Sequence, residues 1–188
     1  MGDELFYLLK SIENNKLTDC VLVAQDHSDI YIDYIYEQLV KNETRSLLGE
    51  VNYKVILFDG DACSLPLENN QFDYCHHFGG INSFKSIEKT ISEMLRVLKS
   101  DSTSRIMFFD ESVAPWLRTK DVGKMVIINN SLYGALLPLA LLPESANDLK
   151  IEWICQNCFY KISFGKGFSA NNIKPNIVHK GPRGGSMS

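Results

Sequence analysis

The chain has 188 residues, which is enough for one domain with a substantial hydrophobic core. Its composition, 45% hydrophobic and 22% charged, is globular, and the net charge of -4 argues against a nucleic-acid-binding surface. The longest apolar run, residues 132–142, is too short to cross a bilayer, and the start of the sequence lacks the features of a secretory signal. Five cysteines in such a chain favour reduced thiols, so we expect a cytoplasmic α/β domain.

The first half of the sequence alternates between helical and strand patterns. Residues 3–14 place their apolar side chains on one helical face, and residues 20–24 form an apolar run of strand length. Residues 29–42 predict a second helix, and residues 55–58 predict a strand that is buried on both faces. A further apolar run, residues 72–79, ends in histidine, phenylalanine and glycine. Polar groups at the carboxyl ends of such strands predict a ligand-binding rim.

The second half predicts a helix, a strand, a cap and a hairpin. Residues 83–99 carry an apolar stripe at helical spacing, and residues 105–109 predict a buried strand. Residues 112–147 are apolar without a sustained period, and we interpret them as a cap inserted over the rim. Residues 149–164 predict an antiparallel hairpin, and residues 167–188 an irregular tail. This order predicts an α/β fold with a doubly wound, mostly parallel sheet.

Four short motifs carry a resemblance to a known family: GDA at residues 60–62, LP at 65–66, FD at 72–73 and EMLRVLK at 93–99. Together they resemble class I S-adenosylmethionine-dependent methyltransferases, most closely the small-molecule group related to ubiquinone and menaquinone biosynthesis methyltransferases. The resemblance covers roughly residues 2–166. It implies a Rossmann-like fold, S-adenosylmethionine as cofactor and a small-molecule methyl acceptor.

The resemblance also implies cofactor-binding positions. Asp26 matches the acidic residue that binds the ribose hydroxyls, for which a carboxylate can accept two hydrogen bonds. Asp61 matches the residue that receives the adenine amino group, and the backbone N–H of Ala62 is expected to face the adenine ring. The remaining expected cofactor positions are Gly2, His27, His77, Phe78 and Gly79.

The apolar segment after Asp110 resembles the variable substrate cap of the family. Asp110, which precedes Glu111 at a strand end, either positions the substrate or simply ends the strand in solvent. Arg118, Tyr133 and Trp116 are candidate contacts for an aromatic or anionic acceptor. The alternative is that they form a small core within the cap, which we favour for Trp116.

No catalytic residue is assigned, because methyl transfer from a sulfonium requires no nucleophile on the protein. A histidine at position 76 or 77 is a candidate general base, since histidine titrates near neutrality. Strand alternation allows only one of the two to face the site, and we favour packing roles for both. Cys155 and Cys158 form a C-x-x-C pair, which alone is a weak metal signal. We expect no metal and two half-buried thiols, although a disulfide across the hairpin is geometrically possible.

One part of the family pattern is missing. The first strand and the glycine-rich loop of the family precede the first helix, so we expect an N-terminally incomplete sheet in which Gly2 is the last trace of the loop. Three explanations are open: a truncated product, a partner chain or second copy that completes the sheet, or residues 176–185, which resemble a strand and a glycine-rich turn. The chain is then either an active methyltransferase or an inactive remnant that serves as a binding module. A nicotinamide dehydrogenase is a weaker third hypothesis, because it also requires the glycine fingerprint.

Overall fold

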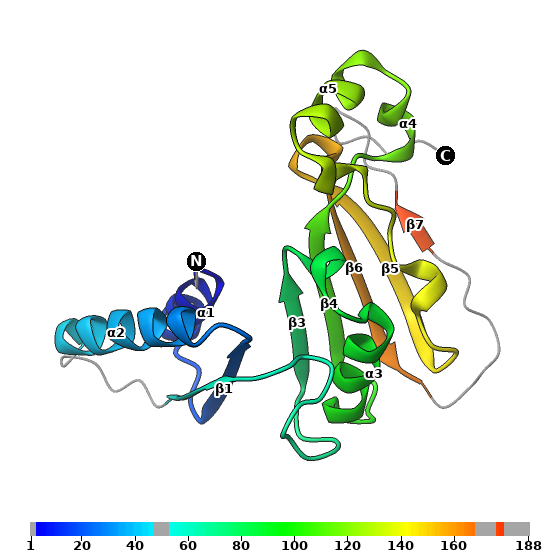
Figure 1. The fold of residues 1–188 in the computed structure, drawn as a ribbon. Coiled ribbons are helices and arrows are strands. Elements are labelled where there is room, and N and C mark those ends of the chain that lie inside the picture. The colour runs from blue at the N-terminus through cyan, green and yellow to red at the C-terminus, as the bar shows by residue number, and fades with distance from the viewer. Residues whose placement is uncertain (1–2, 47–52, 168–175, 179–188) are drawn as a thin grey trace. The chain divides into compact units, whose positions relative to one another are not determined.

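A computed structural model describes residues 3–46, 53–167 and 176–178 (Figure 1). The chain divides into two compact units, Met1–Leu65 and Pro66–Ser188. Each unit has its own hydrophobic core. The expected cofactor residue Gly2 lies outside the described residues.

The first unit is a two-stranded parallel sheet with two helices. Its elements are α1 (Asp3–Asn14), β1 (Cys20–Asp26), α2 (Asp29–Ser46) and β2 (Tyr53–Asp59). The strands run in register from Cys20 opposite Tyr53 to Asp26 opposite Asp59. The sequence pattern predicted all four elements, with strand and helix ends that differ by a few residues.

The helices of the first unit cover one face of the strand pair. Leu5 and Leu9 of α1 and Ile35 of α2 are buried there. The strand side chains that pack against them alternate along β1 and β2: Leu22, Ala24, Tyr53, Val55 and Leu57. This packing follows from the period-two alternation of strands and the apolar stripe of each helix. It holds the carboxyl ends of β1 and β2 side by side.

The second unit contains a five-stranded mixed sheet. Its strands are β3 (Tyr74–Phe78), β4 (Arg105–Glu111), β5 (Ala146–Ile154), β6 (Phe159–Lys166) and β7 (Asn176–Val178). The order is β3-β4-β6-β5-β7, with β3–β4 and β5–β7 parallel and β4–β6 and β6–β5 antiparallel. The predicted α/β class and the C-terminal antiparallel hairpin are therefore confirmed.

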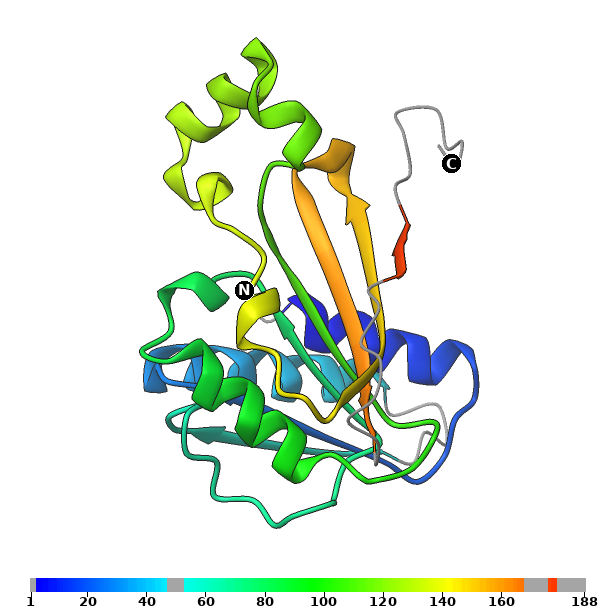
Figure 2. The same ribbon diagram turned by 90° about the vertical axis from the view of Figure 1, so that its right-hand side faces the viewer.

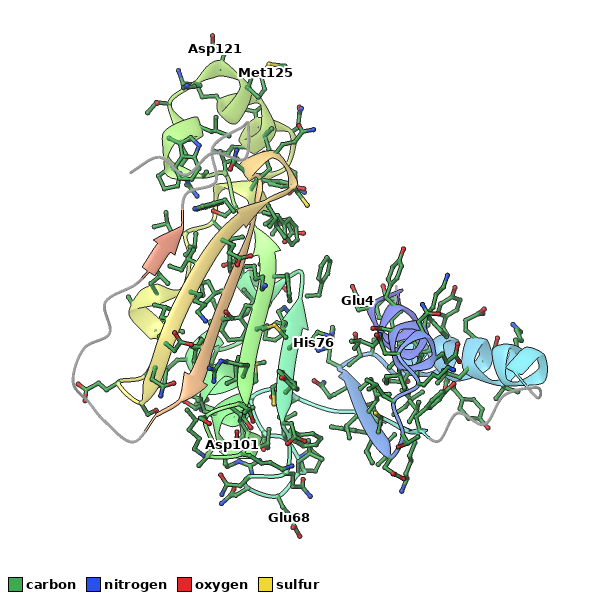
Figure 3. All side chains as sticks on the ribbon, turned by 180° about the vertical axis from the view of Figure 1, so that it is seen from behind. Glu4, Glu68, His76, Asp101, Asp121 and Met125 are labelled. Carbon is green, nitrogen blue, oxygen red and sulfur yellow. The ribbon has the colours of Figure 1, made fainter. Side chains whose placement is uncertain are left out.

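One face of this sheet packs against α3 (Ile87–Val97). Ser86 caps α3, since its hydroxyl accepts a hydrogen bond from the backbone N–H of Lys89 at 3.3 Å. The core between α3 and the sheet contains the buried side chains Ile91, Leu95, Leu98, Ile106, Phe108, Ile162 and Phe164. Figure 2 shows α3 and the turn η3 (Leu139–Leu141) on the same side of the strands. Figure 3 views the sheet from the opposite face, where the β4 side chains are only half-buried.

The cap segment contains two short helices and two turns. They are α4 (Pro115–Arg118), α5 (Asp121–Asn129), η2 (Ser131–Gly134) and η3, and α4 and α5 lie beyond the carboxyl end of β4 (Figure 1). Pro115 occupies the first turn of α4, where its missing N–H costs nothing. Gly123 allows α5 to approach α4, because a Cβ there would overlap the backbone carbonyl of Leu117.

The connection between β5 and β6 is wider than the predicted tight turn. Cys155, Gln156 and Asn157 form the turn η4 (Cys155–Asn157), and all have positive φ values of 48°, 58° and 65°. The backbone carbonyls of Asn157 and Cys158 accept hydrogen bonds from the chain that follows β4. Both cysteines are free thiols, so the hairpin carries no disulfide between them.

The C-terminal strand does not take the place of the family's first strand. β7 pairs with residues 150–152 of β5, at the sheet edge opposite β3. The hypothesis that residues 176–185 fill the gap beside β3 is therefore wrong for the strand itself, and residues 179–185 lie outside the described part of the chain. Residues 167–188, predicted as an irregular tail, contain this short strand. Among the described residues, β1 pairs only with β2, and β3 only with β4.

Candidate functional site

The carboxyl ends of β1 and β2 form an acidic rim in the first unit. Asp26 and Asp59 are register partners at the last pair of the sheet. The backbone N–H of Gly60 donates to the carbonyl of Asp26 at 2.9 Å, and the Gln25 amide donates to the carbonyl of Gly60. These bonds hold the two strand ends together beyond the sheet itself.

Asp26 keeps one carboxylate oxygen available at this rim. Its Oδ1 accepts from the backbone N–H of Ser28 at 3.0 Å and lies 3.2 Å from Nδ1 of His27. The His27 side chain is 88% exposed, so its interaction with Asp26 is weakened by solvent. Both of these interactions use Oδ1, so Oδ2 of Asp26 is the atom that remains for a ligand hydroxyl.

Asp61 and Ala62 follow directly on β2. Asp61 is exposed, and its Oδ1 accepts from the backbone N–H of Cys63 at 2.8 Å, which shapes an Asx-type turn. Ala62 is half-buried beside it. The rim thus presents the carboxylates of Asp26, Asp59 and Asp61, which suit hydroxyl and amino donors and disfavour anions. Sequence reasoning missed Asp59, although the parallel register of the two strands was a signal for it.

The loop after β3 is shaped by a glycine pair. Gly79 and Gly80 have φ values of 72° and 82°, in the left-handed region where side chains are strained. The N–H of Gly79 donates to the carbonyl of Phe109 at 2.7 Å. A Cβ added to Gly79 would lie 4.0 Å from Oε1 of Glu111, so this glycine is required by its backbone angle and not by crowding.

Asp110 anchors this loop from β4. Its side chain is fully buried, and its carboxylate accepts from the backbone N–H groups of Gly80 at 3.0 Å, Ile81 at 2.6 Å and Glu111 at 2.8 Å. A carboxylate that accepts several backbone hydrogen bonds in the interior has little capacity left for a substrate. Asp110 therefore positions the loop that follows β3, and a contact of Asp110 with the acceptor stays a prediction.

Glu111 is the acidic group that this end of β4 presents instead. Its pKa is raised, first by a side-chain hydrogen bond with Asp110, then by burial and by the charge of Asp110. Its Oε2 atom is buried and has no hydrogen-bond partner in the described structure. Tyr160, opposite Asp110 on β6, also has a buried hydroxyl without a partner there, and burial raises its pKa. At the carboxyl end of β4, the Oε2 atom of Glu111 and the Tyr160 hydroxyl are therefore polar groups whose hydrogen bonds the described residues do not supply.

The two histidines of β3 lie on opposite faces of the strand, as alternation predicts. His76 is exposed (labelled in Figure 3), and His77 is half-buried with its ring edge against Phe84 at a centroid distance of 4.7 Å. Phe78 is 50% exposed and packs against Phe109 and Phe159. This places Phe78 with aromatic side chains that the sequence analysis did not connect to it.

Arg118 holds the cap together. Its guanidinium donates to the carbonyls of Val113 at 2.8 Å, Gly134 at 2.9 Å and Ala135, and to the hydroxyl of Ser112 at 2.9 Å. Since Nε, Nη1 and Nη2 all donate hydrogen bonds within the cap, Arg118 has a structural role there. Binding of an anionic acceptor by Arg118 stays a prediction.

Trp116 and Tyr133 differ in their surroundings. The Trp116 ring packs edge-on against Trp153 of β5, with centroids 5.7 Å apart, so it packs against the core of the sheet and not in a separate core of the cap. A substrate contact by Trp116 stays a prediction. Tyr133 is half-buried, and its backbone carbonyl accepts from Val113 at 2.8 Å. A substrate contact by the Tyr133 side chain stays a prediction.

The described residues also bear on metal binding and on membranes. No three histidine, cysteine or acidic side chains gather there as a metal-binding group. None of the described helices combines the length and hydrophobicity that crossing a bilayer requires.

Comparisons with known proteins support one class of fold. Residues 18–106 match the family model described as a methyltransferase domain. The protein PH0226 from Pyrococcus horikoshii shares the fold with a TM-score of 0.56 and 16% identity, over 86% of this chain and 77% of that protein. A putative S-adenosyl-L-methionine-dependent methyltransferase from Methanococcus maripaludis has a TM-score of 0.51 and 19% identity, over 85% and 73%. No curated protein matches the chain significantly.

A further similar structure is described as a possible histamine N-methyltransferase from Thermotoga maritima, with a TM-score of 0.53 and 13% identity over 77% of this chain and 72% of that protein. At such identities the likeness concerns the fold. Against two longer proteins, the chain spans only 35% and 53% of their length. The chain thus contains a segment that matches a methyltransferase-domain model, and it shares its fold with solved structures of which one is described as a putative S-adenosyl-L-methionine-dependent methyltransferase.

Proposed function

We propose that this protein transfers a methyl group from S-adenosylmethionine to a small-molecule acceptor. The observation that carries the proposal is the methyltransferase-domain match over residues 18–106, which includes both the acidic rim and the glycine loop after β3. The likeness in sequence to the quinone-biosynthesis group suggests a small organic acceptor. The cytoplasm is the proposed compartment, where the five free thiols would stay reduced.

The residues of the first rim suit the nucleoside part of the cofactor. Half-buried Asp26 is proposed to accept hydrogen bonds from the ribose hydroxyls, and exposed Asp61 from the adenine amino group. His27, beside Asp26, and the backbone of Ala62 complete this half of the proposed site. Gly2 remains a proposed cofactor residue from the sequence alone.

The end of β3 is proposed to hold the methionine part through His77, Phe78 and Gly79. When bound, the cofactor supplies an electrophilic methyl group on a sulfonium. The chain then has to orient the acceptor and exclude water, and such alignment lowers a barrier by many kcal/mol, on the order of 7–11 in favourable systems. Tyr133, Asp110, Trp116 and Arg118 are proposed acceptor contacts from the sequence, and Glu111 is added as a proposed holder of the proton that an acceptor loses, since its pKa is raised.

Isothermal titration calorimetry with S-adenosylmethionine and S-adenosylhomocysteine tests the proposal on the full chain. We expect binding of both, and roughly tenfold weaker binding after Asp61→Asn, which removes one charge-assisted hydrogen bond. Asp121→Asn is the matched control, because the Asp121 side chain is 98% exposed in the cap. Absence of heat and of a thermal shift at millimolar ligand would contradict the enzyme hypothesis.

A second candidate function is a binding module without activity. The observation that favours it is that β1 and β3 each have a single strand neighbour among the described residues. Open strand edges pair readily with a second copy or with a partner chain. Size-exclusion chromatography with light scattering distinguishes the two: a monomer that binds the cofactor supports the enzyme, and a dimer without cofactor binding supports the module.

A further inference from the structure

Two cysteine thiols lie at the turn η4 between β5 and β6, and the proposed methyl transfer does not use them. Cys155 is exposed and Cys158 is half-buried, and both are free thiols. The backbone N–H of Cys158 donates to the carbonyl of Cys155 at 3.1 Å, which closes a β-turn. The Cα atoms at the ends of such a turn lie within roughly 7 Å, and a disulfide requires a Cα distance of roughly 4.4–6.8 Å. The turn therefore brings the two cysteines into the range of a disulfide.

The surroundings of the two thiols suit oxidation in two steps. The pKa of Cys158 is raised, first by burial and then by the charge of Cys155, so Cys158 stays protonated while Cys155 meets the solvent. The second of these causes also means that each thiol lies within range of the other's charge. Cys75 contrasts with this pair, because burial raises its pKa to about 12 and makes it a poor nucleophile.

The backbone of the turn is strained and needs support from outside. Cys155, Gln156 and Asn157 all have φ values in the left-handed region, which residues other than glycine rarely adopt. Such a conformation persists only where the surrounding structure holds it in place. A covalent link between the two ends of the turn would restrict its opening directly.

Two backbone hydrogen bonds join the turn to the base of the cap. The N–H of Ala114 donates to the carbonyl of Asn157 at 2.9 Å, and the N–H of Ser112 donates to the carbonyl of Cys158 at 3.3 Å. The hydroxyl of Ser112 accepts from Arg118 of α4 at 2.9 Å, so the connection continues into the cap. Figure 1 shows α4 and α5 at the end of the sheet where β5 and β6 are joined. The stiffness of the turn therefore determines how firmly the base of the cap is held.

We propose that Cys155 and Cys158 are a reversible oxidation site whose disulfide locks the turn and, through it, the base of the cap. The oxidant is a small-molecule disulfide such as glutathione disulfide. The Cys155 thiolate attacks one sulfur of this oxidant and releases one glutathione thiolate, which leaves a mixed disulfide. The Cys158 thiol then loses its proton and attacks Sγ of Cys155, and the second glutathione leaves. The two protein thiols are thus oxidised while one glutathione disulfide is reduced to two thiols, and methyl transfer plays no part.

The test is equilibration of the full chain in glutathione redox buffers, followed by acid quenching, alkylation and mass spectrometry. Wild type is expected to form one disulfide between Cys155 and Cys158. Cys158→Ser is expected to accumulate a glutathione adduct on Cys155, because no second thiol displaces it, whereas Cys155→Ser leaves half-buried Cys158 largely unmodified. Cys20→Ser is the matched control and should form the disulfide as wild type does, since Cys20 lies in β1. A wild type that stays reduced in excess glutathione disulfide, or that carries separate adducts on both cysteines, would overturn the proposal.

Hydrogen exchange tests the locking separately, at the backbone N–H groups of Ser112 and Ala114 that donate to the turn. Closing so short a loop restricts its opening, so we expect exchange at both groups to slow by roughly tenfold on oxidation. The double variant Cys155→Ser/Cys158→Ser should show no response to the oxidant. Unchanged exchange in a fully oxidised wild type, or an equal response in the double variant, would contradict the locking of the cap.

Discussion

The two strand rims of this protein use carboxylates in opposite ways. In the first unit, Asp26 is half-buried and Asp61 is exposed, and each accepts a hydrogen bond from a nearby backbone N–H group. In the second unit, Asp110 is fully buried and Glu111 shares a hydrogen bond with it. An exposed carboxylate stays hydrated and can bind a ligand with little effect on folding. A buried carboxylate loses its hydration and needs hydrogen bonds from backbone N–H groups to offset that loss. The same residue type therefore serves recognition in one rim and loop architecture in the other.

The largest expected effect comes from removing the buried acid. Asp110→Ala leaves the N–H groups of Gly80, Ile81 and Glu111 without their acceptor, so we expect the free energy of unfolding to fall by about 3 kcal/mol. Urea denaturation measures it. Asp59→Ala, at the exposed rim, is the matched control, with an expected change within about 0.5 kcal/mol. Similar losses for both variants would remove the distinction between the rims.

A smaller effect is expected in the cap. Arg118→Lys replaces a planar fork by a single ammonium and loses several bonds to the carbonyls of residues 113, 134 and 135, at a cost of about 2 kcal/mol. Lys124→Arg, on the exposed side of α5, controls for the change of cation type. Denaturation monitored by tryptophan fluorescence is the measurement, since Trp116 and Trp153 pack together beside the cap. Unchanged stability would mean that the Arg118 bonds do not hold the cap.

The smallest effect concerns pH. The pKa of Glu111 is raised in the folded protein above its ordinary value of 4.5, so the folded state holds a proton that the unfolded state releases. Stability contributed by this proton is present at low pH and is lost as pH rises through the window above 4.5. Glu111→Gln should remove that part of the pH dependence and be relatively more stable near neutrality. The change is modest, because solvent screens a half-exposed group.

The pH profile of unfolding, compared between wild type and Glu111→Gln, checks this sign. Asp26→Asn serves as the control, since Asp26 lies at the exposed rim of the other unit. If the free energies of unfolding of wild type and Glu111→Gln change in parallel as pH rises above 4.5, the prediction that Glu111 holds a proton in the folded state is contradicted.

Much of the fold could be predicted because it depends on local patterns. The stripes of α1 and α3 and the apolar runs of β1, β2 and β4 fixed the elements and their order, and the hairpin β5–β6 followed from a short polar break. The family resemblance pointed to methyltransferases, and residues 18–106 match that domain. The acids that follow β1 and β2 could likewise be placed at a rim, because parallel strands end on the same side.

The sequence alone determined which residues end the strands, and only the tertiary structure decided what each one does. The choice between Asp110 and Glu111 depends on which face of β4 meets α3, since alternation buries one neighbour and presents the other. The rings of Phe78 and Phe159, 81 positions apart in the sequence, pack together through cross-strand register, which no local pattern encodes. The pairing of β7 with β5 is likewise a tertiary feature, because a strand adds to a sheet edge whose backbone groups are unpaired. Long-range pairing is set by the whole core, and a sequence read locally does not contain it.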